Sequence, residues 1–114
     1  MKGTRVLVAC ELRSYSEALA AAFRGLRPDI EVFEAEAEDL DREVERLDPD
    51  LVVCSRLTAS VEDHAASWVE LYPDHEPRSV ISVLGERSTV EEIQLSDLLS
   101  IIERTERAPL NGAW

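Results

Sequence analysis

The sequence is poor in the features that mark secreted and membrane proteins. It contains two cysteines in 114 residues, so no disulfide framework is expected. Its longest apolar runs, LVVC and VLVAC, have the length of a strand and fall far short of a membrane span. The opening MKGTRVLVAC has neither the longer apolar region nor the small-residue cleavage site of a signal peptide. We therefore expect a cytoplasmic chain with no membrane partner.

Positive charge is scarce, because 12 Lys and Arg residues stand against 24 Asp and Glu residues, a formal net charge of −12. Residues 29–50 alone hold eleven acidic residues and two arginines, a net charge of −9, which is three quarters of the total. Such a face repels phosphate backbones, so we expect no binding to nucleic acid. It is typical of a solvated surface, or of a docking face for a basic partner that would include Glu38, Asp41 and Glu45.

The first half alternates strands and helices. Residues 4–10 and 50–55 are continuous apolar runs, typical of central strands of a parallel sheet, and residues 29–36 predict a half-exposed edge strand. A capping box of Ser14 and Glu17 predicts the start of a helix that Gly25 and Pro28 end. A second helix is expected over residues 38–47, with Leu40, Val44 and Leu47 inward. Right-handed crossovers then give the strand order 2-1-3.

The second half is expected to extend this sheet. Ser60 and Asp63 could cap a short helix that ends at Ala66. Residues 68–72 and 79–84 predict two strands, and the short loop between them suits a hairpin, which favours an antiparallel pair. Ser88 and Glu91 predict the start of a last helix with an apolar face. The chain is thus expected to be α/β, a three-layer sandwich with one domain over residues 1–107 and a tail over residues 108–114.

Three stretches of the first half, over residues 4–57, carry a resemblance to a known family: RVLVACE, RPDIEVFEAE and LDPDLVVCSRL. Their order is similar to that of the first three strands of response-regulator receiver domains. The resemblance implies a flavodoxin-like scaffold with two acids after the first strand and a phosphate-accepting Asp after the third. It further implies a Ser or Thr after the fourth strand and a Lys after the fifth.

Most of those functional positions are not matched here. Cys10 stands at the first acidic position, and Glu11 keeps an acid at the second. Ser55 stands where the phosphate acceptor would be, and Ser cannot form an acyl phosphate. Leu84 or Gly85 takes the Ser/Thr position, and the stretch EEIQ offers no lysine. The sequence therefore predicts a receiver-like scaffold without phosphotransfer.

The candidate site lies at the strand ends and comprises Cys10, Glu11, Arg13, Ser55 and Arg56. A cysteine after a first strand also occurs in phosphocarriers and in small tyrosine phosphatases, but their anion loops need glycines or a set arginine spacing that CELRSYS lacks. Arg56, together with Arg13, is expected to neutralise Glu11 or to contact an anionic ligand.

Three other features of the sequence bear on function. Cys54 follows the neighbouring strand, and the two thiols could in principle share a zinc ion with His64 and Glu11. Because no Cys-x-x-Cys or His pair supports that, we expect no metal and no cofactor. Trp68 and Tyr72 are typical of core, or of an interface if exposed.

Three functions remain open from the sequence. The first is a non-enzymatic, receiver-like regulatory or protein-interaction module, with homodimerisation left open. The second is a phosphocarrier or thiol enzyme that uses Cys10. The third is a small-ligand sensor at the carboxyl ends of the strands.

Overall fold

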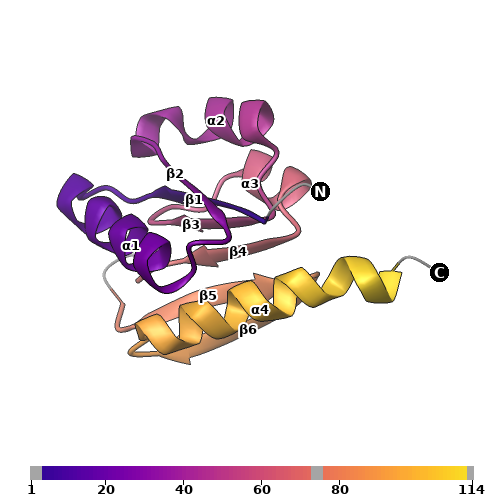
Figure 1. Cartoon of the computed structure of the whole chain (residues 1–114). Helices are drawn as coiled ribbons and strands as arrows, with labels where there is room; N and C mark the ends of the chain where they lie inside the picture. Colours follow the sequence, from indigo (N-terminus) through magenta and orange to yellow (C-terminus); the bar gives the residue numbers. More distant parts are fainter. Residues whose placement is uncertain (1–3, 73–75, 113–114) are drawn as a thin grey trace.

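The computed structural model describes residues 4–72 and 76–112, and side chains as far as Glu106. A single sheet forms its middle layer, and helices cover both faces (Figure 1). The α/β class and the three-layer, flavodoxin-like sandwich predicted from the sequence are therefore confirmed. Among the described residues, no helix is long and apolar enough to cross a membrane.

In the described part of the chain the sheet has six strands in the order β2-β1-β3-β4-β5-β6. They are β1 (Arg5–Ala9), β2 (Glu31–Glu34), β3 (Leu51–Cys54), β4 (Ser67–Glu70), β5 (Arg78–Val83) and β6 (Glu86–Glu91). The first four are mutually parallel, whereas β5 and β6 pair antiparallel with their neighbours. This confirms the 2-1-3 order and the antiparallel hairpin, which is formed by β4 and β5.

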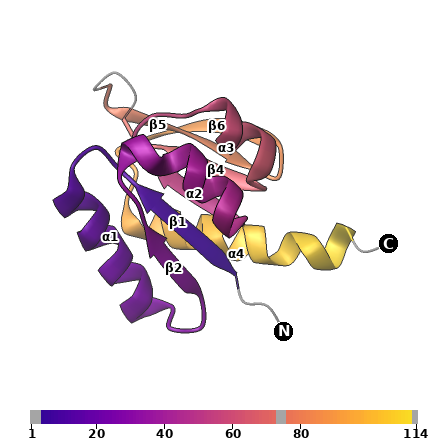
Figure 2. The same cartoon turned by 90° about the horizontal axis from the view of Figure 1, so that it is seen from above.

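The helices divide between the two faces of the sheet (Figures 1 and 2). On one face lie α1 (Arg13–Leu26) and α4 (Leu95–Gly112). On the other lie the short 3-10 helix η1 (Ala37–Asp39), α2 (Leu40–Leu47) and α3 (Ala59–His64). The inward residues predicted for α2 are buried: Leu40, Val44 and Leu47.

The central strands are buried on both sides, as their continuous apolar runs predict. Val6 and Val8 join the core under α1 and α4, whereas Leu7 and Ala9 join the core under α2 and α3. All four residues of β3 are buried as well. Side chains alternate along a strand, so a strand with a helix on each face must be apolar at every position.

Helix α1 does not use the capping box predicted for it. Its N-cap is Leu12, which makes no side-chain hydrogen bond, and Ser14 lies inside the first turn. Gly25 also lies inside the helix, and its φ is not positive. The prediction was wrong at the start because the chain leaving β1 turns into the helix two residues earlier, and at the end because the helix continues through Gly25 to Leu26.

Helix α3 is capped by a different residue from the one predicted. The side chain of Thr58, not Ser60, accepts the N–H of Val61 at 3.3 Å. The helix therefore starts one residue before Ser60, at Ala59.

The predicted start of the last helix is wrong, because Ser88 and Glu91 belong to strand β6. Leu84 and Gly85 have φ values of 54° and 93°, and they reverse the chain so that β6 pairs with β5 along its length. Helix α4 begins at Leu95, where the Asp97 carboxylate accepts the N–H of Gln94 at 2.8 Å. It continues to Gly112, through residues 108–112 that the sequence assigned to the tail.

Candidate functional site

The residues that follow β1 and β3 lie together, because neighbouring parallel strands end at one edge of the sheet. The N–H of Glu11 donates to Ser55 Oγ at 2.8 Å, which joins the two junctions directly. The N–H of Cys10 donates to Ser16 Oγ, also at 2.8 Å, from the first turns of α1. The two backbone donors beside the Cys10 sulfur are therefore already bonded and do not form an anion cradle.

The Cys10 thiol is buried, with 3% of the residue exposed. Burial raises the pKa of this thiol, and hydrogen bonds with the Ser16 and Ser55 side chains offset part of that rise. A nucleophilic cysteine needs the opposite, a lowered pKa and some access. The structure thus places Cys10 in the core, in an environment that does not activate a thiol.

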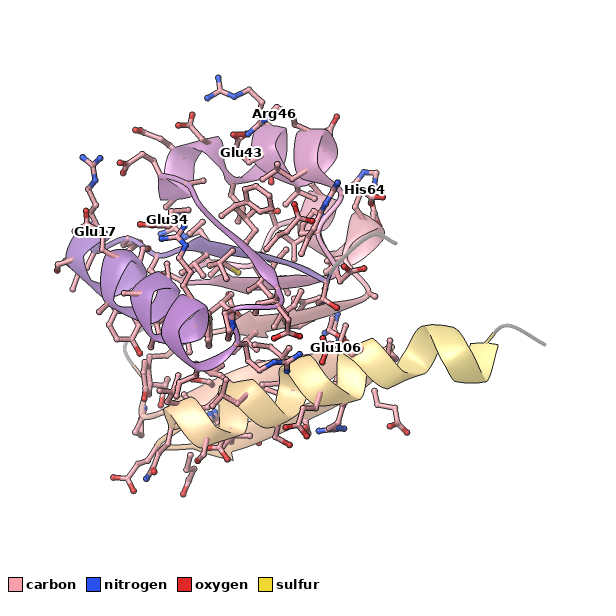
Figure 3. The ribbon with its side chains drawn as sticks, in the orientation of Figure 1. Glu17, Glu34, Glu43, Arg46, His64 and Glu106 are labelled. Atoms are coloured by element: carbon pink, nitrogen blue, oxygen red, sulfur yellow. The ribbon has the colours of Figure 1, made fainter. Side chains whose placement is uncertain are left out.

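Cys54 is fully buried and belongs to the opposite core, under α2 and α3. Burial, with smaller contributions from the charges of Glu70 and Cys10, raises the pKa of this thiol from 9.0 to about 12. Since Cys10 and Cys54 lie in cores on opposite faces of the sheet, they do not share a zinc site. Among the described residues, no group of three or more His, Cys, Asp or Glu side chains could hold a metal. His64 is exposed at the far end of α3 (Figure 3), away from the carboxyl edge.

Of the two arginines in the candidate site, Arg56 contacts Glu11, whereas Arg13 contacts acidic residues outside the site. The Arg56 guanidinium lies 3.8 Å from the Glu11 carboxylate, and both side chains are mostly exposed. Arg13 pairs instead with Glu17 at 3.9 Å and Glu36 at 3.7 Å. Exposed pairs of this kind contribute about 0–1 kcal/mol each, so they neutralise charge rather than fix geometry.

The structure brings one further carboxylate to this edge that the sequence did not indicate. Glu70 ends β4, is half-buried, and accepts the N–H of Leu57 at 2.8 Å. The receiver resemblance put the end of residues 79–84 in the position that follows the fourth strand, whereas in the sheet the neighbour of β3 is β4, within the strand predicted over residues 68–72. The turn of Leu84 and Gly85 consequently lies at the opposite edge from Cys10, because β5 runs antiparallel to β4. Placing Glu70 at this edge from the sequence would have required knowing that β4 lies beside β3 and runs parallel to it.

The aromatic residues considered for an interface do not form one patch. Trp68 is 3% exposed, in the core under α2 and α3, with the Arg87 guanidinium 5.2 Å from the centre of its ring. Tyr72 packs against the other core and is half-buried, and its hydroxyl donates to the carbonyl of Ile93 at 3.3 Å. Of the two readings that the sequence left open for Trp68, the structure supports core and not interface.

The three acidic residues considered for an interface are all exposed: Glu38, Asp41 and Glu45. Asp41 also accepts the hydroxyl of Thr58, the cap of α3, at 2.6 Å. This acidic face thus remains available to a partner.

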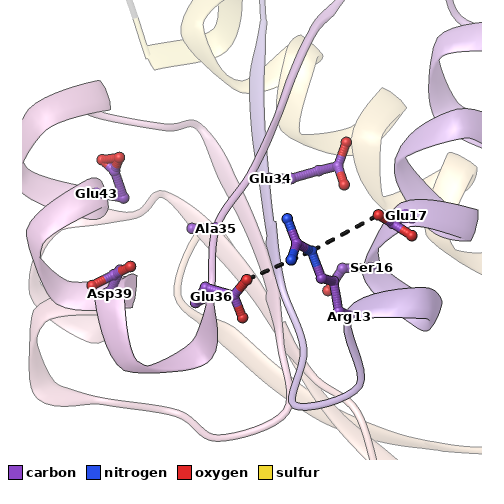
Figure 4. Close-up of a pocket in the computed structure, with 8 residues that line it drawn as sticks. All are labelled: Arg13, Ser16, Glu17, Glu34, Ala35, Glu36, Asp39 and Glu43. Carbon is purple, nitrogen blue, oxygen red and sulfur yellow. Dashed lines mark ion pairs between the residues drawn. The ribbon is translucent and has the colours of Figure 1, made fainter.

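A pocket of about 270 Å³ opens beside this face, between α1, the end of β2 and α2 (Figure 4). Its lining residues are Arg13, Ser16, Glu17, Glu34, Ala35, Glu36, Asp39 and Glu43. Each of the five carboxylates has an arginine within 4 Å, supplied by Arg13, Arg24, Arg42 and Arg46. Glu43 and Arg46 lie together on α2 (Figure 3), and this arginine holds the pKa of Glu43 below its usual range. The sequence showed the acidic run but not that it encloses a hollow.

No family model and no curated protein matches this sequence. Among solved structures the chain is similar to methionyl-tRNA formyltransferase from Clostridium thermocellum, with 9% sequence identity and a TM-score of 0.47. The alignment covers 96% of this chain and 62% of the formyltransferase chain, so the chain spans less than two thirds of that structure. A similarity at this level carries no argument about activity.

Proposed function

We propose that this chain is a non-enzymatic, receiver-like regulatory or protein-interaction module that works in the cytoplasm without a cofactor. The observation that supports this most is the closed junction at the ends of β1 and β3. There the hydroxyls of Ser16 and Ser55 occupy the backbone donors that an anion would need.

Phosphotransfer chemistry has little to work with at this junction. Ser55 takes the acceptor position, and its oxygen already accepts a backbone N–H. Glu11 contacts Arg56, and one oxygen of Glu70 accepts a backbone N–H, so a divalent cation would have to compete with both interactions. A magnesium ion prefers several oxygen ligands in octahedral geometry, which a thiol and a serine hydroxyl do not replace.

Phosphorylation and alkylation test the non-enzymatic part of the proposal. We expect no mass gain of one phosphate after incubation with acetyl phosphate and magnesium. We also expect slow alkylation of Cys10 by iodoacetamide in a Cys54→Ala background, no faster than that of a buried thiol. A phosphoryl adduct on Cys10 or Glu11, or a rapid reaction near neutral pH, would establish the thiol-enzyme alternative instead.

The interaction part of the proposal concerns the exposed acidic face of Glu38, Asp41 and Glu45. A fluorescent Lys/Arg-rich peptide should bind at physiological salt, and the triple variant E38Q/D41N/E45Q should bind it several-fold more weakly. A matched triple variant at exposed acids elsewhere, E91Q/E92Q/E103Q, controls for net charge. Equal weakening by both triple variants would mean non-specific attraction, and this docking face would be wrong.

The pocket beside α2 favours a second candidate, the small-ligand sensor. A ligand for it would carry basic groups, which would compete with the paired arginines for the five carboxylates of the lining. A thermal-shift screen of small diamines, polyamines and basic amino acids tests this. Stabilisation that disappears in Glu36→Gln but remains in Glu91→Gln would support the sensor, and the absence of any shift would exclude these ligands.

A further inference from the structure

The outer face of α1 carries no charge, although a third of the chain is charged. Its inner face packs on the sheet through Ser16, Leu19, Ala20 and Phe23. Its outer face presents exposed small residues at helical spacing, namely Ser14, Ala18, Ala21 and Gly25. In both views no other helix or strand lies outside α1 (Figures 1 and 2). The face is therefore unpartnered within the described part of the chain.

Two large exposed apolar side chains flank this face. They are Tyr15, 39% exposed, and Leu26, 55% exposed, two of the four exposed large apolar residues among those described. These two are eleven residues apart, about three helical turns, so they lie on the same side of the outer face at its two ends. On its other side lie Glu17 and Arg24, about two turns apart and both half-exposed or more. Within the chain Arg24 binds Glu34 at 3.0 Å, and Glu17 lies 3.9 Å from Arg13, so a partner's charges would add to these exposed pairs.

These residues are arranged symmetrically along the helix. Tyr15 and Leu26 are equally distant from the point midway between Ala20 and Ala21, and so are Glu17 and Arg24. A two-fold axis at that point would place an identical helix antiparallel to α1. Each Tyr15 would then face the partner's Leu26, and each Glu17 would face the partner's Arg24. The small side chains between them allow the helix axes to approach to about 8 Å.

We infer that a second copy of this chain docks on α1, with the two α1 helices antiparallel about this axis. Charge supports the choice of occupant. Residues 12–28 hold three arginines and one glutamate, a net charge of +2, so the remainder of the chain carries −14. Two copies would repel each other least, and attract through Glu17 and Arg24, where these two segments meet. The inference goes beyond the proposed function and does not depend on it.

The contact is small, because a helix of 14 residues is about 21 Å long. An interface of this size belongs with weak, transient contacts, so the dimer should depend on concentration. Sedimentation velocity from about 10 µM to about 1 mM covers that range of affinity. We expect a shift from monomer to dimer across it.

Two alanine-to-glutamate variants locate the interface. Ala21→Glu adds a charge in the centre of the outer face and should leave a monomer at every concentration. Ala59→Glu adds the same charge at an exposed position of α3, on the other side of the sheet, and should dimerise as the parent does. Equal circular dichroism and melting curves show that both variants fold.

A charge exchange tests the antiparallel geometry. Glu17→Arg should weaken the dimer at least tenfold, because the introduced guanidinium would meet the partner's Arg24. The double variant E17R/R24E should restore it, since the opposite charges exchange places.

A parent that stays monomeric at about 1 mM would overturn the inference, and so would a dimer that survives Ala21→Glu. A dimer lost in Thr89→Pro but not in Ala21→Glu would place the contact at the open edge of β6 and would also overturn it.

Discussion

Ser16 and Ser55 make equivalent hydrogen bonds but from different degrees of burial. Ser16 is 3% exposed and accepts the N–H of Cys10 inside the core, whereas Ser55 accepts the N–H of Glu11 at the surface. Replacing Ser16 with Ala would leave a buried N–H without an acceptor, which costs about 1–3 kcal/mol. After Ser55→Ala, water can replace the hydroxyl at the exposed N–H of Glu11.

We therefore predict that Ser16→Ala lowers the free energy of unfolding by about 1–3 kcal/mol and Ser55→Ala by well under 1 kcal/mol. Urea denaturation followed by circular dichroism measures both. Equal losses in the two variants would mean that burial does not distinguish the two bonds.

The Cys54 thiol predicts a loss of stability at alkaline pH. Its pKa is raised by burial from 9.0 to about 12, so the folded protein keeps the proton longer than the unfolded chain does. The stabilisation is complete below pH 9 and is lost progressively as the pH rises from about 9 toward 12. The free energy of unfolding should fall between pH 8 and pH 10.5.

The variant Cys54→Ala isolates this effect, because it removes the titrating group and keeps a small apolar side chain. Its decline between the same two pH values should be smaller than that of the parent. Parallel declines would assign the alkaline loss to other groups.

At the scale of elements, the sequence predicted what hydrophobic periodicity controls. The central strands around Val8 and Val53 and the inner face of α2 were right, because burial on both faces or on one stripe leaves a pattern in the chain. The hairpin of β5 and β6 was missed because β6 is exposed at nearly every position and has no such pattern. Its turn also places Leu84 at a positive φ, a conformation that Leu seldom adopts.

The candidate site was predicted in part for the same reason. Cys10 and Ser55 could be placed together because they end predicted neighbouring strands. The acceptor role of Ser16 could not be predicted, since it depends on where α1 begins. Glu70 was missed with the direction and neighbour of β4.

The turn of Leu84 and Gly85 provides a test of strain at this scale. Both residues have positive φ in a two-residue hairpin turn, the arrangement that favours Asn-Gly. Leu84→Asn should raise the free energy of unfolding by about 0.5–1 kcal/mol, because Asn tolerates this region and the Leu side chain is half-exposed.

Gly85→Ala should act in the opposite direction and destabilise by about 1 kcal/mol or more. A Cβ at Gly85 would meet nothing within 4 Å, so this loss would come from backbone conformation and not from a clash. Urea midpoints of the two variants measure both effects. If Leu84→Asn were destabilising, the turn would not be the strained element that its φ values indicate.

The whole molecule is governed by an excess of negative charge that local pairs do not cancel. Around the pocket five carboxylates share four arginines, a net charge of −1, and the exposed acidic face of Glu38, Asp41 and Glu45 adds three further negative charges. The pair of Arg27 and Glu106, at 2.7 Å and about a quarter exposed, ties α1 to α4. Exposed pairs each contribute little, so the repulsion that remains from a net charge of −12 determines the response to salt.

We predict that salt stabilises this protein. Raising sodium chloride from about 10 mM to about 200 mM shortens the screening length from about 30 Å to less than 10 Å, which removes repulsion between distant carboxylates. Contacts closer than 4 Å are weakened much less. The melting temperature should rise by several degrees, since about 1 kcal/mol corresponds to about 4–8 °C in a domain of this size. Differential scanning calorimetry at low micromolar protein measures this on the monomer, and chloride avoids the general stabilisation that sulfate gives to any protein.

The double variant E38Q/E45Q, which removes two exposed charges from the acidic face, should melt higher at low salt and respond less to salt. A melting temperature that falls as salt is added would show that the ion pairs outweigh the repulsion, and the acidic face would then be a stabilising network.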